Sequence, residues 1–482
     1  MSVSNYATAE EAILHAMEFS PTDDQAHAAK AVAMLLCSDK PNPTLIINGF
    51  AGTGKTTLTK AICSAARQMG FKTSLLAPTG RAAKVLSNTT RLFASTIHRT
   101  IFKQYNTEGG RSFPLTQNKQ NNTLFIVDEA SLIPNGNSSV SQSAASWGSG
   151  FLLNDLVEYV FSAPNNRLIL IGDPDQLPPI GCDAPPALDP DTLTSLGLTV
   201  GRCFLRQIVR QTEGLIIQDA TLLRKTINDT DATDLPTLVG ADNEQVELLS
   251  GESLTEKIES AYSQFGPQNT IIITRSNAAA AKISMGLRQQ VMATEECLTR
   301  GDLLMVTRNN YLWTRNLPQV GFIANGDIAE VVSVNSFSSL YGLQFADVSV
   351  RLLEHDNIDI DCLLLLDTLT ADVWLNGNRL KSTAEINEIL SNGFEEDYAD
   401  VSPWKRAIAM HDDPHFNALQ ARFSYATTCH KAQGGQWQAV FVDASCRQLT
   451  DENLQSEARW LYTAATRATE RLFLVNYPKA DL

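Results

Sequence analysis

The chain has 482 residues, enough for two to four domains. Its apolar fraction of 43% and charged fraction of 19% are those of an ordinary globular protein, and no apolar run approaches the length of a membrane span. The net charge of −15 argues against a protein that binds nucleic acid over its whole surface, but it does not exclude a local basic channel.

The eight cysteines are scattered along the chain and form no C-x-x-C pair. This pattern favours reduced thiols and indicates neither a zinc site nor a disulfide framework. The first ten residues carry no basic and apolar leader pattern, so we expect a cytoplasmic protein that does not associate with a membrane.

The sequence SPTDDQ at 20–25 predicts the start of a helix, with Gln25 in its first turn. The side-chain amide of Gln25 offers both a donor and an acceptor, which match the edge of an adenine base. Taken alone, Gln25 would be a surface glutamine.

The run GFAGTGKT at 49–56 fits the phosphate-binding pattern G-x-x-x-x-G-K-[ST]. An apolar strand is predicted before it at 45–47, and a helix rich in Ala after it at 57–69. This order directs backbone N–H groups and the positive end of a helix dipole at a polyphosphate. We expect Lys55 to reach the β- and γ-phosphates and Thr56 to hold Mg²⁺. The residues expected to bind the nucleotide here are Gly52, Thr53, Gly54, Lys55, Thr56 and Thr57.

Further apolar strands are predicted at 74–77, 124–127 and 168–171, with a helix at 80–87. Apolar strands that alternate with helices favour the α/β class, with a parallel sheet covered on both faces. The polar stretch 99–122 contains a Gly-Gly pair and scattered aromatic residues, and it predicts a small hairpin inserted into this domain.

Acidic and amide side chains follow two of these strands. Asp128 is expected to hold Mg²⁺ through water, and Glu129 to orient and deprotonate the attacking water. Gln176, in GDPDQLPP, is placed to sense the γ-phosphate. The alternatives are a solvated turn for the two acids and a proline-stiffened loop for Gln176.

The second half of the chain repeats the alternation of strands and helices. Strands are predicted at 270–274, 439–442 and 471–475, and helices at 277–290 and 454–468. We assign 1–205 to a first ATPase domain, 206–324 and 419–482 to a second domain, and 325–418 to a small β-rich insertion.

Charge that develops on a transferred phosphoryl group is commonly met by arginine from a second domain. Arg210 and Arg467 are the two candidates for this role. Taken alone, either is more often a surface arginine.

These pieces, in this order, resemble superfamily 1 DNA helicases, in particular the RecD-like or Dda-like branch. The resemblance covers the chain from Gln25 to Arg467. Many ordered matches are far more specific than any one of them. In chain order, the matching strings are PTDDQ, GFAGTGKTT, APTGRAAKVL, STIHR, IVDEAS, IGDPDQLPPIG, LRQIVRQ, GDLLMVTRNNY with FIANGDIAEV, ATTCHKAQGGQW and LYTAATRA.

The resemblance implies two RecA-like P-loop domains with parallel sheets and ATP with Mg²⁺ between them. It also implies a hairpin in the first domain and a small SH3-like β-barrel in the second. The implied activity is ATP-driven movement from 5′ to 3′ on single-stranded DNA, with separation of the duplex at DNA forks. We expect the chain to act as a monomer.

The resemblance implies the same nucleotide-binding roles for the residues named above. Gln25 would contact adenine, and Arg210 and Arg467 would contact the phosphates. The residues that it implies in the DNA channel are Thr79, Arg81, His98, Thr428, His430 and Lys431. Four aromatic residues are candidates for stacking on DNA bases, with core packing as the alternative for each: Phe102, Tyr105, Phe113 and Trp437.

Two other functions remain open from the sequence. The chain could be an RNA helicase of the same superfamily, with the same ATPase domains acting on RNA instead of DNA. An ATP-gated clamp or loader binds single-stranded DNA without unwinding the duplex.

Overall fold

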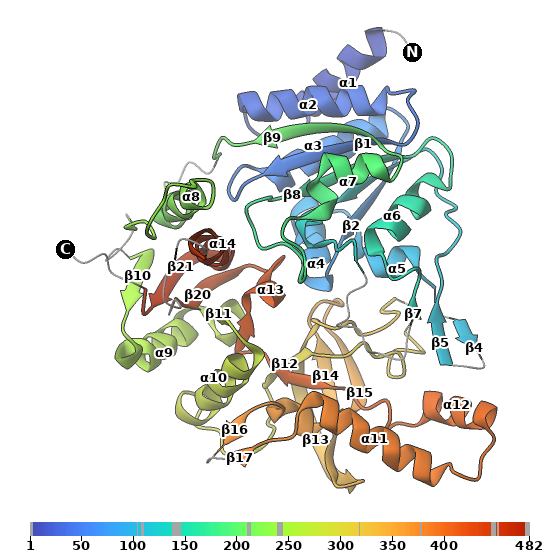
Figure 1. Cartoon of the computed structure of the whole chain (residues 1–482), viewed down its shortest axis with the longest axis vertical. Helices are drawn as coiled ribbons and strands as arrows, with labels where there is room; N and C mark the ends of the chain where they lie inside the picture. Colours follow the sequence, from blue (N-terminus) through green and yellow to red (C-terminus); the bar gives the residue numbers. More distant parts are fainter. Residues whose placement is uncertain are drawn as a thin grey trace.

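The computed structural model describes residues 3–103, 105–107, 110–136, 146–209, 214–238, 244–317, 319–375, 378–444, 450 and 453–477. They form two parallel sheets and a five-stranded barrel (Figure 1). The first sheet lies at the top of Figure 1, the second sheet at the left and the barrel below them. No helix in these ranges is both long and apolar enough to cross a membrane.

The first sheet has the strand order β3-β2-β6-β8-β1-β9, and all its strands are parallel. Its four central strands contain few exposed residues because helices cover both faces. The strands are β1 (Pro43–Gly49), β2 (Lys72–Ala77), β3 (Ala94–Thr96), β6 (Thr123–Val127), β8 (Arg167–Gly172) and β9 (Thr199–Leu205).

Alternate residues of these strands enter two separate cores. One core joins Ile47 and Ile169 to helices α1–α4, and the other joins Ile46 and Leu168 to α5–α7. The predicted doubly covered α/β sheet is thereby confirmed. The helices are α1 (Val3–His15), α2 (Asp23–Leu36), α3 (Lys55–Gln68), α4 (Gly80–Thr90), α5 (Ile97–Ile101), α6 (Leu152–Phe161) and α7 (Pro190–Ser195).

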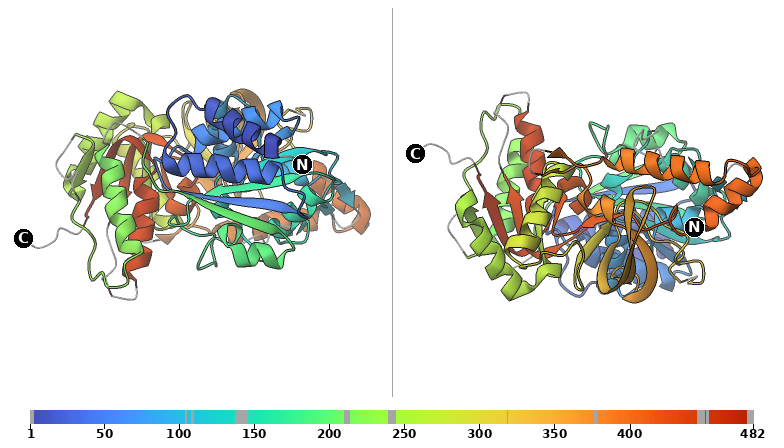
Figure 2. Two further views of the ribbon diagram at one scale, coloured as in Figure 1. Left: turned by 90° about the horizontal axis from the view of Figure 1, so that it is seen from above. Right: turned by 90° about the horizontal axis from the view of Figure 1, so that it is seen from below.

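The second sheet has the order β10-β21-β20-β11-β19 and is also parallel. Helices α8, α13 and α14 cover one face, and α9 and α10 cover the other. The two sheets stand side by side, as seen from above in Figure 2. The elements are α8 (Leu215–Ile227), β10 (Val246–Leu249), α9 (Leu254–Phe265), β11 (Thr270–Thr274), α10 (Asn277–Gln290), β19 (Ala426–Thr428), α13 (Cys429–Ala432), β20 (Trp437–Asp443), α14 (Leu454–Ala465) and β21 (Ala468–Val475).

The third sheet confirms the predicted small β-barrel. Its strands run in the order β15-β14-β13-β12-β18, and a parallel bridge between Leu364 and Leu419 joins its two edges. The strands are β12 (Leu303–Val306), β13 (Ile328–Leu340), β14 (Leu343–Leu352), β15 (Ile358–Leu365) and β18 (Ala421–Phe423). The predicted limits of 325–418 therefore cut through the barrel, because β12 and β18 lie outside them.

The barrel and the second sheet share one hydrophobic core. Val348 and Val350 of the barrel belong to the same cluster as Ile272 and Phe441 of the second sheet. Only Ser424 and Tyr425 separate β18 of the barrel from β19 of the second sheet. Tyr425 is fully buried, and its hydroxyl accepts a hydrogen bond from the backbone N–H of Leu303 at 3.2 Å.

The predicted hairpin is also present, as β4 (Tyr105–Thr107) and β5 (Gly110–Phe113), with a short third strand, β7 (Ser146–Trp147), beside β5. The loop between β12 and β13 packs beside it, since the Tyr311 ring lies 5.0 Å from the Phe113 ring. Arg99 of α5 donates to the carbonyl of Gln319 in the same loop.

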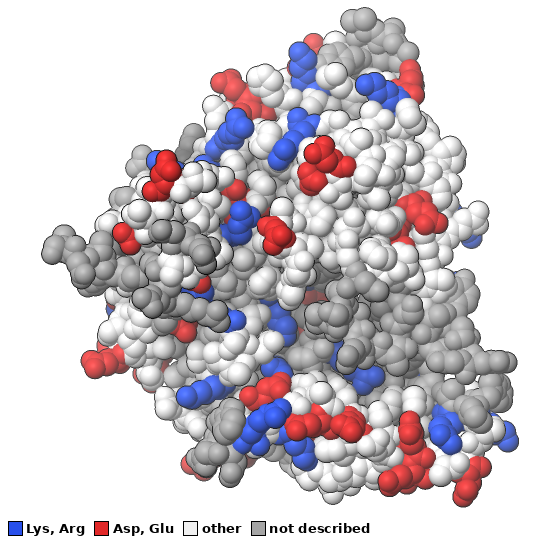
Figure 3. Space-filling view, viewed as in Figure 1, with Lys and Arg blue, Asp and Glu red and all other residues white. Residues whose placement is uncertain are grey.

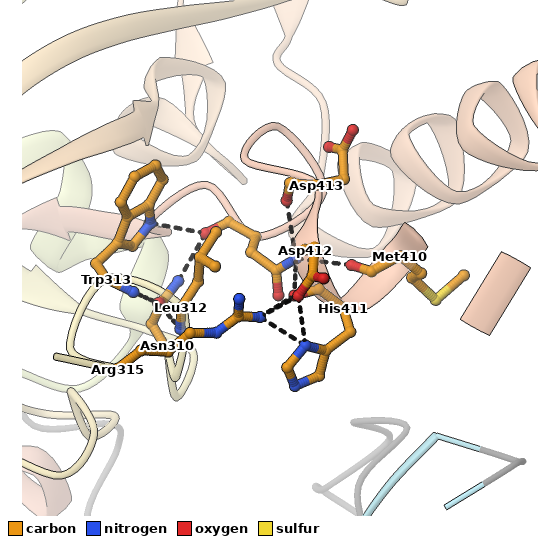
Figure 4. Close-up of polar contacts among 9 residues, drawn as sticks. Asn310, Leu312, Trp313, Arg315, Met410, His411, Asp412 and Asp413 are labelled. Atoms are coloured by element: carbon orange, nitrogen blue, oxygen red, sulfur yellow. Dashed lines mark hydrogen bonds and ion pairs between the residues drawn. The ribbon is translucent and has the colours of Figure 1, made fainter. Parts of the chain in front are cut away.

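Residues in the middle of this loop bond to a helical arm of the barrel and to the chain that follows it (Figure 4). Trp313 Nε1 donates to the carbonyl of Asn417 at 2.9 Å, and Arg315 Nη2 donates to Asp412 Oδ1 at 2.6 Å. The arm consists of α11 (Thr383–Asp397) and α12 (Pro403–Asp412), and β16 (Trp374–Leu375) and β17 (Asn378–Arg379) precede it.

Candidate nucleotide and nucleic-acid site

The phosphate loop joins β1 to α3, as the sequence predicts. Gly52 and Gly54 have φ angles of +78° and +79°, which favour glycine, and a Cβ on Gly54 would lie 2.6 Å from Gln25 Nε2. Lys55 Nζ donates to the carbonyls of Gly49 at 2.8 Å and Phe50 at 3.0 Å. Thr56 and Thr57 follow Lys55 in the first turn of α3. The loop therefore has the form and the donors of a polyphosphate cradle.

Gln25 braces this loop from α2. Its Oε1 accepts from the backbone N–H of Thr22, within a capping box, and its Nε2 donates to the carbonyl of Thr53 at 3.1 Å. Gln25 is only 2% exposed. Both amide groups are thus engaged within the chain, and the contact with adenine stays a prediction.

The two acids lie directly after β6, at the edge of the sheet where the phosphate loop lies. Burial, followed by the nearby Glu129 charge, raises the pKa of Asp128 to about 6, and the Lys55 ammonium opposes this shift. Glu129 has a φ angle of +52°, a conformation that is rare for a residue with a side chain. A carboxyl with a raised pKa beside a lysine fits a site that gains from a bound cation. Thr56 and Asp128 are the residues that would hold Mg²⁺.

The loop after β8 carries a further buried acid, Asp173. Burial raises the pKa of Asp173, while the Lys55 charge and the hydrogen bond from Tyr462 oppose the shift. Asp173 Oδ1 accepts from the backbone N–H of Asp175, and its Oδ2 lies 3.5 Å from Gln176 Nε2. Gln176 is 2% exposed, and its Oε1 has no hydrogen-bond partner among the described residues. A buried acceptor without a partner is ready to accept a hydrogen bond from a ligand or a water.

Helix α14 of the second sheet forms the opposite wall. The Tyr462 hydroxyl donates to Asp173 Oδ2 at 2.5 Å and accepts from the backbone N–H of Ala51, in the phosphate loop, at 3.3 Å. Arg459 Nη1 donates to the carbonyl of Pro174 at 2.9 Å. Sequence reasoning did not select Asp173, Arg459 or Tyr462.

The two candidate arginines differ in what the structure describes of them. Arg467 is 4% exposed, and its guanidinium donates to the carbonyls of Thr463 at 3.1 Å and Gly435 at 3.4 Å, on the second-sheet side. Arg210 lies outside the described residues. The chain just before it reaches the phosphate loop, because the backbone N–H of Val209 donates to the carbonyl of Gly52 at 3.0 Å.

Comparison with known proteins matches the two sheets to two families in order. Residues 21–235 match the family described as an AAA domain, and residues 423–475 match the UvrD-like helicase C-terminal domain. The match to a helicase C-terminal domain supports the resemblance to superfamily 1 helicases that the sequence motifs indicate.

Among the curated relatives of this chain, the ATP-dependent RecD2 DNA helicase of Deinococcus radiodurans is 33% identical over 167 residues, which is 35% of this chain and 19% of that protein. An uncharacterized protein of Methanocaldococcus jannaschii is 33% identical over 155 residues, which is 29% of this chain and 12% of that protein. The chain thus matches no more than about a fifth of the length of these relatives.

Solved helicase structures align along nearly the whole chain at low similarity. The Pif1 helicase from Bacteroides, in complex with ADP-AlF3 and single-stranded DNA, gives a TM-score of 0.43 at 15% identity and covers 95% of this chain and 93% of that chain. The Pif1 helicase from Candida albicans gives a TM-score of 0.40 at 16% identity and covers 95% of each chain.

On the side expected to bind DNA, the first turn of α4 is covered by other parts of the chain. Thr79 caps this helix, accepting from the backbone N–H of Ala82. The Arg81 guanidinium lies 3.7 Å from the centre of the Trp437 ring, at the start of β20. Arg81 and Trp437, both predicted to contact DNA, thus contact each other across the two sheets.

Most of the aromatic candidates are packed in the core rather than presented as platforms. Phe102, Phe113 and Trp437 are 7%, 3% and 5% exposed and belong to hydrophobic clusters. Of the two interpretations of these rings, the structure shows core packing, because each lies where a helix or loop covers it. Tyr105 lies in β4, and its side chain is outside the described residues.

Polar groups that remain accessible gather after β19. Thr428 is partly exposed, and His430 and Lys431 are exposed on the short helix α13. Surrounding protein and the charge of Arg422 lower the pKa of Lys431 to about 8. By contrast, burial lowers the pKa of His98 to about 4, so that His98 is neutral at pH 7.

Proposed function

We propose that this chain is an ATP-dependent DNA helicase that moves from 5′ to 3′ on single-stranded DNA and separates the duplex. The observation that carries the proposal is the nucleotide site with two walls. The phosphate loop, the acids after β6 and Gln176 belong to the first sheet, and Tyr462 of α14 reaches them from the second. When a nucleotide is bound between two such walls, its hydrolysis changes the distance between the two domains.

ATP with Mg²⁺ supplies the phosphoanhydride bond whose hydrolysis drives the cycle. We propose that Lys55 and the loop N–H groups of Gly52, Thr53 and Gly54 hold the phosphates. In this proposal Glu129 accepts a proton from the attacking water, and Gln176 orients that water or senses the γ-phosphate. Arg210 and Arg467 then supply positive charge as the domains close.

The track is proposed to be DNA because the matched relative of Deinococcus radiodurans is named a DNA helicase. We assign the contacts with the strand to Thr79, Thr428, His430 and Lys431. Arg81 and Trp437 would join them if the contact between the two sheets opens. We also propose that the protein acts as a monomer in the cytoplasm.

One set of substrates tests the unwinding activity, its direction along the strand, and the choice between DNA and RNA. Partial duplexes with a 5′ or a 3′ single-stranded overhang are incubated with and without ATP, and ATP turnover is measured with single-stranded DNA and with RNA. The proposal expects DNA-stimulated turnover and unwinding of the 5′-overhang substrate only. Stimulation by RNA alone would favour the RNA helicase, and turnover without strand separation would favour the clamp or loader.

A further inference from the structure

One face of α14 holds the loop that follows β8. Arg459, Tyr462 and Thr463 are spaced i, i+3 and i+4, so they lie on the same side of the helix. Arg459 binds the carbonyls of Pro174 and Gln176, and Thr463 Oγ1 accepts from the backbone N–H of Leu177 at 2.9 Å. Tyr462 also bonds to the phosphate loop, since its hydroxyl accepts from the backbone N–H of Ala51.

We propose that Tyr462 is a positioning residue for hydrolysis, which sets Gln176 by way of Asp173. The inference rests on the proposed function and deepens it, because it names the contact through which the second sheet controls the reacting site.

The first step of the relay is the bond between Tyr462 and Asp173. Asp173 is fully buried and Tyr462 is 2% exposed, so water has little access to replace the hydroxyl as a donor. A buried carboxylate that loses a donor is costly, and its environment has to rearrange. The hydroxyl therefore fixes the position of the Asp173 carboxylate.

The second step runs from Asp173 to Gln176. The same Oδ2 atom that accepts from Tyr462 lies 3.5 Å from Gln176 Nε2, and Oδ1 accepts from the backbone N–H of Asp175. Asp173 thus restrains both the side-chain amide and the backbone before it. Since Gln176 Oε1 is buried without a partner in the described chain, its direction matters for any group that donates to it.

The third step returns to the phosphate loop. The Tyr462 oxygen accepts from the backbone N–H of Ala51, so one hydroxyl touches the loop that receives the phosphates and the acid that orients Gln176. A change in the conformation of the loop on nucleotide binding or release therefore acts directly on α14, through the bond between Ala51 and Tyr462. Withdrawal of α14 releases Asp173 and Gln176 together, which couples hydrolysis to domain closure.

The test is a double-mutant cycle on DNA-stimulated ATP turnover. Tyr462→Phe keeps the ring and removes only the hydroxyl, and we expect kcat to fall about tenfold, because Gln176 is then no longer held in position for the transition state. The Kd for ADP should change less than about twofold. In a Gln176→Ala background, Tyr462→Phe should lower kcat by less than about twofold, because the residue through which it acts is already gone.

Tyr477→Phe is the matched control, since the Tyr477 hydroxyl donates to the carbonyl of Pro236 at 2.9 Å and lies in the core of the second sheet. Its kcat should equal that of the wild type. Equal losses from Tyr462→Phe in both backgrounds, or no loss in either, would overturn the relay. A wild-type protein without DNA-stimulated turnover would instead overturn the proposed function, so the two failures are distinct.

Discussion

Lys55 carries the most direct residue-scale prediction. Its ammonium is held by two carbonyls of its own loop, ready to transfer to a phosphate. Lys55→Ala should lower ATP turnover at least about a hundredfold, because it removes a charge used in the transition state. Steady-state hydrolysis measures the loss, and circular dichroism checks the fold. Lys60→Ala is the control on the same helix, since Lys60 forms an exposed ion pair with Glu18, and it should keep full turnover.

Glu354 gives a pH-dependent prediction. Burial, with the nearby Asp327 charge, raises the pKa of Glu354 to about 7 from an ordinary 4.5. Between these values the folded protein binds more protons than the unfolded chain, so stability should fall as pH rises from about 4.5 to about 7. Glu354→Gln should flatten this dependence and raise stability at pH 8 by up to about 3 kcal/mol.

Urea unfolding of wild type and variant at pH 5 and pH 8 measures this change. Glu388→Gln, on the exposed side of α11, is the control and should follow the wild-type curve. A Glu354→Gln protein that is less stable than the wild type at pH 8 would contradict the assignment.

Some residues of the candidate nucleotide site are determined by short sequence patterns, and others by contacts between distant parts of the chain. The phosphate loop and the acids after β6 were predictable, because each depends on a short spacing next to an apolar strand. Tyr462 and Asp173 were not, since they meet across 289 positions of sequence and no local pattern encodes that contact. The burial of Phe102 likewise depends on elements packed over it.

At the scale of elements, Gly393 in α11 has a specific packing role. A Cβ at this position would lie 2.4 Å from Cγ of Tyr341, whose hydroxyl donates to Asp397 on the same helix. Gly393→Ala gains up to about 1 kcal/mol of helix propensity but must push the Tyr341 ring aside, so we expect a net loss of about 1–2 kcal/mol.

Thermal unfolding of Gly393→Ala tests this loss. Gly286→Ala in α10 is a close control, because no atom lies within 4 Å of the added Cβ, and it should leave the Tm unchanged or raise it slightly. An increase in Tm for Gly393→Ala would show that the ring moves without cost.

Helices and strands were predictable where their own pattern is strong. Helix α10 was predicted at 277–290 and is observed as Asn277–Gln290. Strand β9 was not predicted, because it is an edge strand whose residues are mostly exposed or half-buried and it is not an apolar run. Strands β12 and β18 have four and three residues, too few for a period to emerge, and their pairing decides where the barrel begins and ends.

At the scale of the whole molecule, the net charge of −15 restricts where a polyanion binds. Acidic and basic side chains are interspersed on the face shown in Figure 3, so no single sign dominates it. If the proposed function holds, binding to single-stranded DNA should depend on a few local cations, among which the exposed Lys431 is the clearest candidate.

Salt dependence measures the number of those cations. Lys431→Ala should lower affinity for single-stranded DNA and reduce the slope of log K against log salt by about 0.7, the value for one phosphate contact. Fluorescence anisotropy from 50 to 300 mM salt, roughly, gives the slope. Lys257→Ala removes a lysine of the outer helix α9 that is paired with Glu247. The salt slope of this variant should match that of the wild type. Identical slopes for all three proteins would remove Lys431 from the interface.

The two-residue connection between β18 and β19, together with the shared core, has a mechanical consequence. Rotation of the barrel against the second sheet would expose apolar side chains of this shared core to water, which costs more free energy than bending a flexible linker. We therefore expect the barrel and the second sheet to move as one unit if the two walls of the nucleotide site separate.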